Sequence, residues 1–383
     1  MISYVIPTRD RHERLEQTLH AIAALGAHEA EVVIVDNDSR QPVRTGDHLA
    51  SGVPVRVLRM SENLGAAARN AGARECSPGS AWIVMLDDDS HPLDLAFIPR
   101  LAAQDPDVAA VSADIFLPRH ARRESGGLPE VFVGCGVAIR RALFLNLNGY
   151  DPSFNYYAEE YDLAARMLLA GFGIAFEPSF RVAHHKVEAG RDMNLICARL
   201  VRNNGWVMQR YAPEECRRAE LREIRTRYRA IATKEHAIAG FAQGLSELRR
   251  TVRAQKRTPM PPALFDRFTG LAHARAALNV AWQQGPFRTA ALVHEGKNAW
   301  CVRRVLGELG VREVPEQSAE ARIIATMSPG PMLDALEQTA ASPRRVIAPW
   351  IAAVKQLADQ AGATASQSDA PGRHERQTEA IMR

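Results

Sequence analysis

The stretch Trp82-Ile83-Val84-Met85-Leu86-Asp87-Asp88-Asp89 joins five apolar residues directly to three acidic ones. An apolar run of this length is typical of a buried strand in an α/β sheet. Ligands of such sheets bind just beyond the carboxyl ends of the strands, where these aspartates fall. A divalent cation that neutralises the three carboxylates could also bind substrate phosphates. A solvated acidic turn explains the triplet equally well, because Asp is common in turns and Pro92 follows.

The composition of the 383-residue chain is that of an ordinary globular protein, with room for about two domains. Five cysteines without paired or metal-type spacing favour a reducing cytoplasm over a disulfide framework. No stretch approaches the ~20 apolar residues that span a bilayer, and the N-terminal residues lack the features of a secretion signal. These observations predict a cytoplasmic protein.

The basic residues are unevenly distributed within a net charge of +4. Between Arg199 and Arg257 there are 15 Lys and Arg residues against 6 Asp and Glu residues. A basic segment of this kind suits peripheral contact with the inner face of a membrane. A solvated helical face explains it equally well. No nucleic-acid partner is expected.

The first half of the chain alternates strand-like and helix-like stretches. Strands are predicted at residues 3–7, 31–35, 53–58, 82–86, 131–139 and 174–183. Helices are predicted at residues 13–25, 64–75 and 160–170. This alternation predicts an α/β fold with a mainly parallel sheet that carries helices on both faces.

The second half is predicted to be helical from residue 192 to 282 and then to alternate again, as a small Rossmann-like α/β unit. The first turn of this unit, His294-Glu295-Gly296-Lys297-Asn298, lacks the full glycine pattern of a dinucleotide site, so we expect a structural or acceptor-positioning role. The expected domains are therefore residues 1–211, a basic helical extension at 212–285, the small Rossmann-like domain at 286–361 and a disordered polar tail at 362–383.

Four further polar clusters follow predicted strands or begin a helix in the first half. They are Pro7-Thr8-Arg9-Asp10-Arg11, Asp36-Asn37-Asp38, the stretch from Glu62 to Gly72, and Glu159-Glu160-Tyr161-Asp162-Leu163. Each cluster alone is explained by a polar loop or by acids in the first turn of a helix. Their joint occurrence, in this order around the aspartate triplet, indicates one site.

With these motifs the chain resembles an inverting family 2 glycosyltransferase of the GT-A fold, similar to rhamnosyltransferase-like members. The resemblance covers residues 1–211, and its motifs are loose one by one but specific as an ordered set. The matching stretches are residues 5–8, 33–39, 62–72, 85–89, 134–140, 149–151 and 159–163. The resemblance implies a mixed, mainly parallel GT-A sheet in this part of the chain.

The resemblance also implies roles in binding a nucleotide-sugar donor and a metal. The family positions that bind the base and ribose of the donor, or lie in the helix against the nucleotide, correspond here to Pro7, Thr8, Arg9, Asp36, Asn63, Arg69 and Asn70. Asp87 and Asp88 share in binding the donor. The positions that bind Mn²⁺ or Mg²⁺ in the family correspond here to Asp87, Asp89 and His184, and His184 is preferred over His185 as the histidine ligand.

The catalytic base of the family corresponds to Glu160, where Asp is more usual. The longer side chain leaves Glu159 and Asp162 as alternatives. The base takes the proton of the acceptor hydroxyl, which attacks the anomeric carbon from the face opposite the leaving group and inverts it.

The expected function is therefore metal-dependent, inverting transfer of a sugar from a UDP-, dTDP- or GDP-sugar to a hydroxyl of a glycan, a lipid-linked glycan or a small molecule. A nucleotidyltransferase is an alternative, but it would favour a glycine-rich phosphate loop near the N-terminus. A sugar-nucleotide-binding module without catalysis is another, and the retained acidic motifs argue against it. The small Rossmann-like unit could carry a second activity, so a bifunctional protein is a further alternative. The sequence does not define the sugar, the nucleotide, the acceptor or the oligomeric state.

Overall fold

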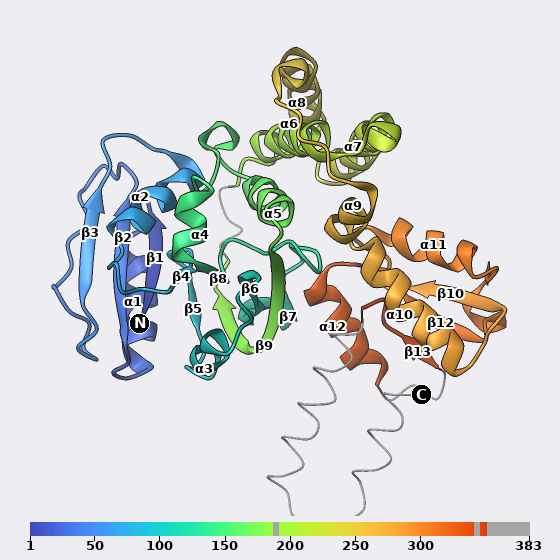
Figure 1. Cartoon of the computed structure of the whole chain (residues 1–383). Coiled ribbons are helices and arrows are strands. Elements are labelled where there is room, and N and C mark those ends of the chain that lie inside the picture. The colour runs from blue at the N-terminus through green and yellow to red at the C-terminus, as the bar shows by residue number, and fades with distance from the viewer. Residues whose placement is uncertain (187–190, 341–344, 351–383) are drawn as a thin grey trace, which may run out of the picture.

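The computed structural model describes residues 1–186, 191–340 and 345–350 (Figure 1). The tail expected at residues 362–383 lies outside the described residues, as does the end of the expected domain at 286–361. Within the described part of the chain, no helix combines the length and the hydropathy that crossing a membrane requires.

A large sheet forms the N-terminal half, and its first part is parallel. Strand β1 (Ile2–Thr8) lies between β2 (Ala30–Asp36) and β4 (Trp82–Met85), and β3 (Val55–Arg59) pairs with β2. Alternate β1 residues enter two apolar cores, one containing α1 (His12–Ala24) and the other α2 (Ala68–Glu75). Helices thus cover both faces, because side chains alternate along a strand. The predicted parallel strands are confirmed.

The remaining part of the sheet is mixed. Strand β8 (Val137–Arg140) runs antiparallel between β4 and β6 (Val108–Leu117), and β9 (Gly173–His184) is parallel to β6. The short β5 (Ser90–Pro92) and β7 (Arg122–Arg123) pair antiparallel with β9 and β6. The order is β3-β2-β1-β4-β8-β6-β9-β5, so the fold is the expected mixed, mainly parallel α/β sheet.

Two strand predictions in this part need correction. The sequence analysis missed β6, the longest strand of this part after β9. The strand expected at residues 131–139 begins only at Val137. The preceding residues form turns, in which the Gly136 N–H donates to the Val133 carbonyl, so this glycine-containing segment reaches the site as a loop.

Helices follow the sheet along the chain. The sheet domain contains α3 (Phe97–Ala102), α4 (Arg141–Asn146) and α5 (Glu159–Leu169). The expected helical stretch then forms α6 (Met193–Tyr211), α7 (Glu214–Lys234) and α8 (Ile238–Thr251). Helix α8 packs closely on α6 through Gly244, where an added Cβ would lie 2.3 Å from the Ala198 carbonyl oxygen.

A second, smaller sheet is wholly parallel, in the order β11 (Arg312–Glu313), β10 (Thr289–Val293), β12 (Ala321–Ile324) and β13 (Val346–Ile347). Its neighbours are α9 (Pro262–Thr269), α10 (Leu271–Gln284), α11 (Ala299–Glu308) and α12 (Pro329–Thr339). The expected small α/β arrangement is therefore present. We call this part, residues 262–350, the C-terminal unit.

The C-terminal unit packs against the large sheet through α12, which lies beside β7 (Figure 1). The buried Arg123 of β7 donates to Asp114 at 2.9 Å, to Asp334 at 2.9 Å and to Glu337 at 2.7 Å. Ser328 also donates to the Gly126 carbonyl at 2.7 Å. These contacts hold the loop that follows β7, which forms part of the site.

Candidate active site

A cavity of about 560 Å³ opens beyond the carboxyl end of β4, and we call it the donor cavity. Its volume falls within the ~300–1,000 Å³ that small-molecule sites commonly have. Six of the residues expected from the sequence line it: Arg69, Asp87, Asp89, Glu159, Glu160 and His184. Further lining residues that the sequence analysis did not assign are Arg11, Glu124, Cys135, Tyr150, Tyr156, Tyr157 and Lys186.

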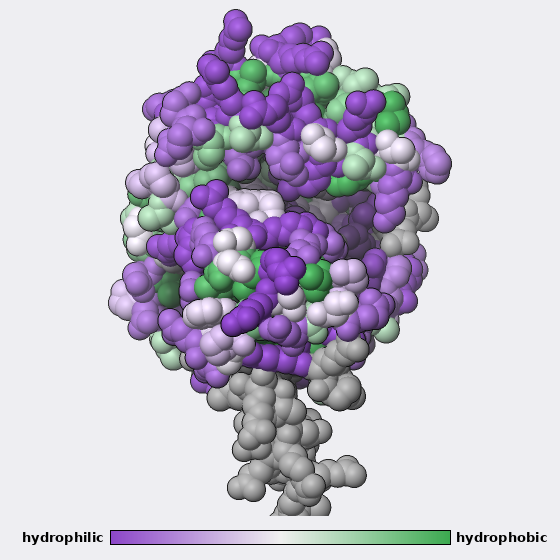
Figure 2. Space-filling view, turned by 90° about the vertical axis from the view of Figure 1, so that its right-hand side faces the viewer, coloured by the Kyte–Doolittle hydropathy of each residue, from purple (hydrophilic) through white to green (hydrophobic). Residues whose placement is uncertain are grey.

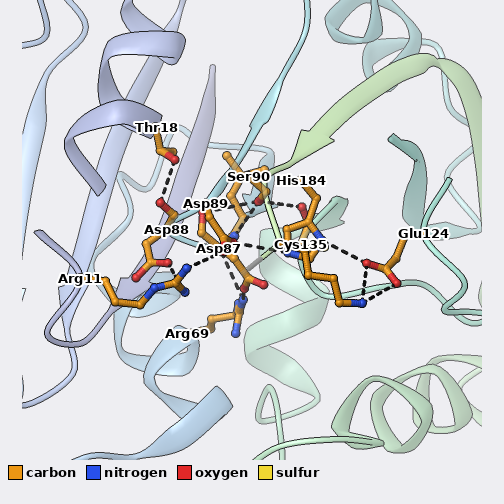
Figure 3. A network of polar contacts seen from close by, with 12 residues as sticks. Arg11, Thr18, Arg69, Asp87, Asp88, Asp89, Ser90, Glu124, Cys135 and His184 are labelled. Atoms are coloured by element: carbon orange, nitrogen blue, oxygen red, sulfur yellow. Dashed lines mark hydrogen bonds and ion pairs between the residues drawn. The ribbon is translucent and has the colours of Figure 1, made fainter. Parts of the chain in front are cut away.

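The aspartate triplet is paired with two arginines (Figure 3). Arg11 contacts Asp88 at 2.6 Å and Asp89 at 2.5 Å, and Arg69 forms an ion pair with Asp87. The sequence argument considered only a divalent cation as the partner of these carboxylates. The structure shows that side chains of the chain itself supply much of the compensating charge.

Burial and charge act in opposite directions on the buried pair of aspartates. Burial raises the pKa of Asp88 to about 7, although Arg11 and a 2.7 Å hydrogen bond from Thr8 oppose the shift. Burial acts in the same direction on Asp89, but hydrogen bonds from His184 and Arg11 outweigh it and lower the pKa of Asp89. Asp89 is therefore the aspartate whose negative charge the site stabilises.

Three possible metal-ligand atoms gather at this end of the cavity. A carboxylate oxygen of Asp87, Sγ of Cys135 and a ring nitrogen of His184 lie within 4.8 Å of one another. Asp89 Oδ1 is buried and lies 3.4 Å from His184 Nε2. Carboxylate oxygens with an imidazole suit Mn²⁺, so the side chains expected from the sequence fit such an ion. Cys135 is a neighbour that the sequence analysis did not predict.

His184 is held from its other side by residues that the sequence analysis missed. Its Nδ1 lies 3.1 Å from Glu124, which also accepts from Lys186 at 3.0 Å (Figure 3). Burial opposes charge on His184, but Cys135, Asp89 and Glu124 outweigh it and raise its pKa. Since a metal binds neutral imidazole, binding at Nε2 would release a proton. His185 instead stacks on His91 and does not line the cavity.

The acidic pair lies at the N-terminus of α5 and lines the same donor cavity as Asp87 and Asp89. Glu159 is buried, and its Oε2 has no hydrogen-bond partner among the described residues. Burial raises the pKa of Glu159, and the neighbouring carboxyl of Glu160 raises it further. Burial also raises the pKa of Glu160, against the effects of its backbone contacts and Arg69. A raised pKa suits a general base that works near neutral pH.

Asp162, the third base candidate, lies outside the donor cavity. It is fully buried and accepts hydrogen bonds from Arg166 at 2.9 Å, Arg210 at 2.8 Å and the Tyr211 hydroxyl at 2.7 Å. Its carboxylate therefore anchors α5 to α6. The geometry gives it no access to an acceptor hydroxyl.

The loop before α5 adopts an unusual backbone conformation. Tyr157 and Ala158 have φ angles of 73° and 68°, in the left-handed region that non-glycine residues rarely occupy. The buried side-chain amide of Asn203, on α6, donates to the carbonyls of Phe154, Tyr156 and Tyr157 at 2.9, 2.9 and 2.7 Å. Asn203 thus holds the loop that presents the acidic pair.

Comparison with known families agrees with this architecture. The family model described as Glycosyl transferase family 2 matches residues 3–154. Residues 3–154 are thus similar to glycosyltransferase family 2. The match includes β1, β2, β4 and the aspartate triplet, which together form one side of the donor cavity.

Curated proteins that are similar to this chain match parts of it. A pre-mycofactocin glycosyltransferase of Mycobacterium tuberculosis is 26% identical over 207 residues, covering 48% of this chain and 42% of the relative. A dolichol-phosphate mannosyltransferase of Pyrococcus furiosus is 37% identical over 105 residues, covering 26% of this chain and 28% of the relative. The chain thus spans less than half the length of these relatives.

Solved structures give weaker similarities. A mannosyltransferase of Pyrobaculum calidifontis, in complex with GDP-Man and Mn²⁺, has a TM-score of 0.41 at 17% identity and covers 74% of this chain and 82% of its own. A structure of GalNAc-T7 with UDP, GalNAc and Mn²⁺ has a TM-score of 0.44 at 17% identity, covering 66% of this chain and 57% of its own.

Several residues that the resemblance assigns to the family 2 donor do not line the donor cavity. The Asp36 carboxylate is fully buried and accepts from the Ser39 and Val43 N–H groups and from Arg59. Asn70 bonds both the N–H and the carbonyl of Tyr150. The others outside the cavity lining are Pro7, Thr8, Arg9, Asn63 and Asp88. Their contact with a nucleotide stays a prediction.

Some of the missed residues carried a signal in the sequence. Arg11 belongs to the first polar cluster, and Cys135 lies inside the glycine-flanked family 2 stretch at 134–136. Glu124 and Lys186 stood in no motif. Their place in the site depends on the pairing of β7 with β6 and on the end of β9, which the local sequence does not reveal.

Proposed function

We propose that this protein is a metal-dependent, inverting glycosyltransferase that moves a sugar from a nucleoside diphosphate sugar to an acceptor hydroxyl. The observation that carries the proposal is a single cavity that is lined both by Asp87 and Asp89, after the end of β4, and by Glu159 and Glu160 of α5. The aspartates suit binding of the diphosphate end of a donor, and the glutamates suit removal of a proton from an acceptor.

The donor end would be bound by charge. A divalent ion such as Mn²⁺ or Mg²⁺, held by Asp87, Asp89 and His184, would supply a Lewis acid that stabilises charge on the departing diphosphate. Arg11 and Arg69 line the same cavity and place two fixed positive charges beside it. Both arginines are ion-paired here, so binding a diphosphate would redistribute contacts that already exist.

Glu160 would take the proton from the acceptor hydroxyl as that oxygen attacks the anomeric carbon. Attack from the side opposite the diphosphate inverts the configuration at that carbon. Glu160 and the aspartates line the same cavity, whose volume of about 560 Å³ leaves room for a reacting sugar. The partial burial of Glu160 keeps its surroundings poor in water, and this raises its basicity.

The named relatives support a sugar donor and leave its identity open. One is described as a glycosyltransferase and another as a mannosyltransferase. UDP-, dTDP- and GDP-sugars remain the candidate donors. A row of exposed arginines along α7, at positions 218, 222, 225 and 229, supports a further proposal of contact with an anionic membrane surface, which co-sedimentation with anionic vesicles would test.

Release of nucleoside diphosphate from a panel of UDP-, dTDP- and GDP-sugars, with Mn²⁺ or Mg²⁺, tests the proposal. At least one donor should be hydrolysed. Asp89→Ala should lower the rate about a hundredfold or more, because the diphosphate loses several kcal/mol of stabilisation. Asp47→Ala, an exposed aspartate outside the cavity, serves as the control and should match the wild type. No turnover with any donor, or full activity of Asp89→Ala, would contradict the proposal.

A further inference from the structure

A second cavity of about 190 Å³ adjoins the donor cavity. Segments that are distant in the sequence form its walls: the loop at residues 126–133, residues 157–161, helices α6 and α7, the end of α9 and the start of α11 with the turn before it. Gly126, Val133, Tyr157 and Glu160 line both cavities. Figure 2 views the molecule from the side of the C-terminal unit, and the largely hydrophilic surface there is hollowed near its centre.

We propose that this second cavity binds the acceptor, and that the acceptor presents a single ring with an apolar face and a free hydroxyl. A sugar ring and a phenol both have this chemistry. The inference rests on the proposed glycosyltransferase function and adds to it the acceptor class and a role for the C-terminal unit.

The size and the lining of the cavity favour one ring. An apolar protein cavity of about 150 Å³ takes up benzene, so about 190 Å³ accommodates a six-membered ring with a substituent. Six aromatic side chains contribute to the lining, namely Phe132, Tyr157, Tyr161, Tyr228, Phe268 and Trp300. Aromatic faces stack on planar rings and on the C–H face of sugars.

The charges of the cavity disfavour a phosphate-bearing acceptor. Its two cations already have partners: Lys297 donates to the Tyr161 hydroxyl at 2.8 Å, and Arg227 lies 5.1 Å from the centre of the Tyr228 ring. Glu220 and Glu223 also line it, and neither side chain forms a hydrogen bond or an ion pair among the described residues. A phosphate would therefore meet more acidic than basic groups, Glu160 included.

The arrangement distinguishes the two members of the acidic pair. Glu160 lines both cavities, whereas Glu159 lines only the donor cavity. A hydroxyl on a ring bound in the second cavity would therefore meet Glu160 at the junction, with the donor sugar on the other side. The proton moves from that hydroxyl to Glu160, the new bond joins the acceptor oxygen to the anomeric carbon, and the diphosphate leaves with the bonding electrons.

The C-terminal unit would then complete the acceptor site. Lys297, Asn298 and Trp300 come from the turn after β10 and the start of α11. In a Rossmann-like unit this turn commonly binds a nucleotide, but here Lys297 points to Tyr161, on α5 beside the base. The unit thus faces the acceptor side of Glu160.

The inference is tested with the nucleotide sugar that the hydrolysis assay identifies as the donor. Transfer of its sugar is measured to methyl β-D-glucopyranoside, to tyramine and to undecaprenyl phosphate in detergent micelles. We expect transfer to the sugar ring or to the phenol. Trp300→Ala should raise the KM for that acceptor at least tenfold and change the KM for the donor less than twofold. Glu223→Arg, an exposed substitution that leaves the core intact, should raise the acceptor KM in the same way. Glu215→Arg, on the same helix but outside the cavity, serves as the control.

The outcomes separate the two proposals. Donor hydrolysis together with an unchanged acceptor KM in both cavity variants would overturn the acceptor cavity alone. Transfer to undecaprenyl phosphate with none to either ring acceptor would overturn the assigned chemistry, as would transfer to none of the three probes. Absence of hydrolysis with every donor would overturn the glycosyltransferase function and this inference with it.

Discussion

Replacing Asn203 with Ala should damage catalysis through the loop before α5. The amide of Asn203 faces three backbone carbonyls at 2.7–2.9 Å, and an amide has two N–H groups to give. A buried hydrogen bond contributes about 1 kcal/mol net, so the substitution should lower the free energy of unfolding by about 2 kcal/mol, and by more if the carbonyls stay without water.

The same loss should reach the active site because the loop is strained. Left-handed backbone costs a non-glycine residue roughly 1–2 kcal/mol, and both Tyr157 and Ala158 adopt it. Without the amide the loop should relax and displace the acidic pair, so kcat should fall at least about tenfold, which corresponds to 1.4 kcal/mol. The KM for the donor should change little, since the aspartates remain in place.

Steady-state kinetics and denaturant unfolding of Asn203→Ala would measure both effects. Asn279→Ala is a matched control, because the Asn279 amide donates only to the Arg275 carbonyl of its own helix. A kcat within twofold of the wild-type value, with the expected loss of stability, would refute the reasoning that this amide positions the catalytic loop.

Three further predictions concern packing and pH. Arg123→Met should lower the free energy of unfolding by about 3–5 kcal/mol, because it removes a buried cation that bonds Asp114, Asp334 and Glu337. Limited proteolysis should then release the C-terminal unit. Gly244→Ala should lower the free energy of unfolding by about 1–3 kcal/mol, because the added methyl group overpacks α8 against α6. Gly307→Ala, in open space within α11, should instead raise it by up to about 1 kcal/mol, and equal effects of the two variants in thermal melts would contradict the packing. Because burial raises the pKa of Glu160 and the base must be deprotonated, kcat should fall as the pH drops through a value above 4.5, and an acid limb at or below 4.5 would count against Glu160.

The strands and the cavity-lining acids were accessible from the sequence because both depend on local patterns. Apolar runs ending in polar residues located β1, β2 and β4, and the ends of parallel strands necessarily meet at one edge of a sheet. Asp87, Asp89, Glu159, Glu160 and His184 accordingly share one cavity. No local pattern revealed β6, since its Ala-rich and Ser-containing run resembles other buried segments.

The partners of these acids were not accessible in the same way. The sequence analysis considered a cation for the aspartate triplet, but Arg11 and Arg69 also pair with it, from the start of α1 and from α2. Such pairs depend on the distance between elements. The second cavity depends on this even more, because the loop at 126–133, α7 and the start of α11 are far apart in the sequence and all line it.

The most direct test of the account compares Glu160→Gln with Glu159→Gln. Both changes keep the shape of the side chain and remove its basicity. We expect Glu160→Gln to lower kcat for transfer about a hundredfold or more while thermal-shift titration with the nucleoside diphosphate and Mn²⁺ gives wild-type affinity, and Glu159→Gln to have a smaller effect. Wild-type transfer by Glu160→Gln would contradict the central claim that this carboxylate is the base.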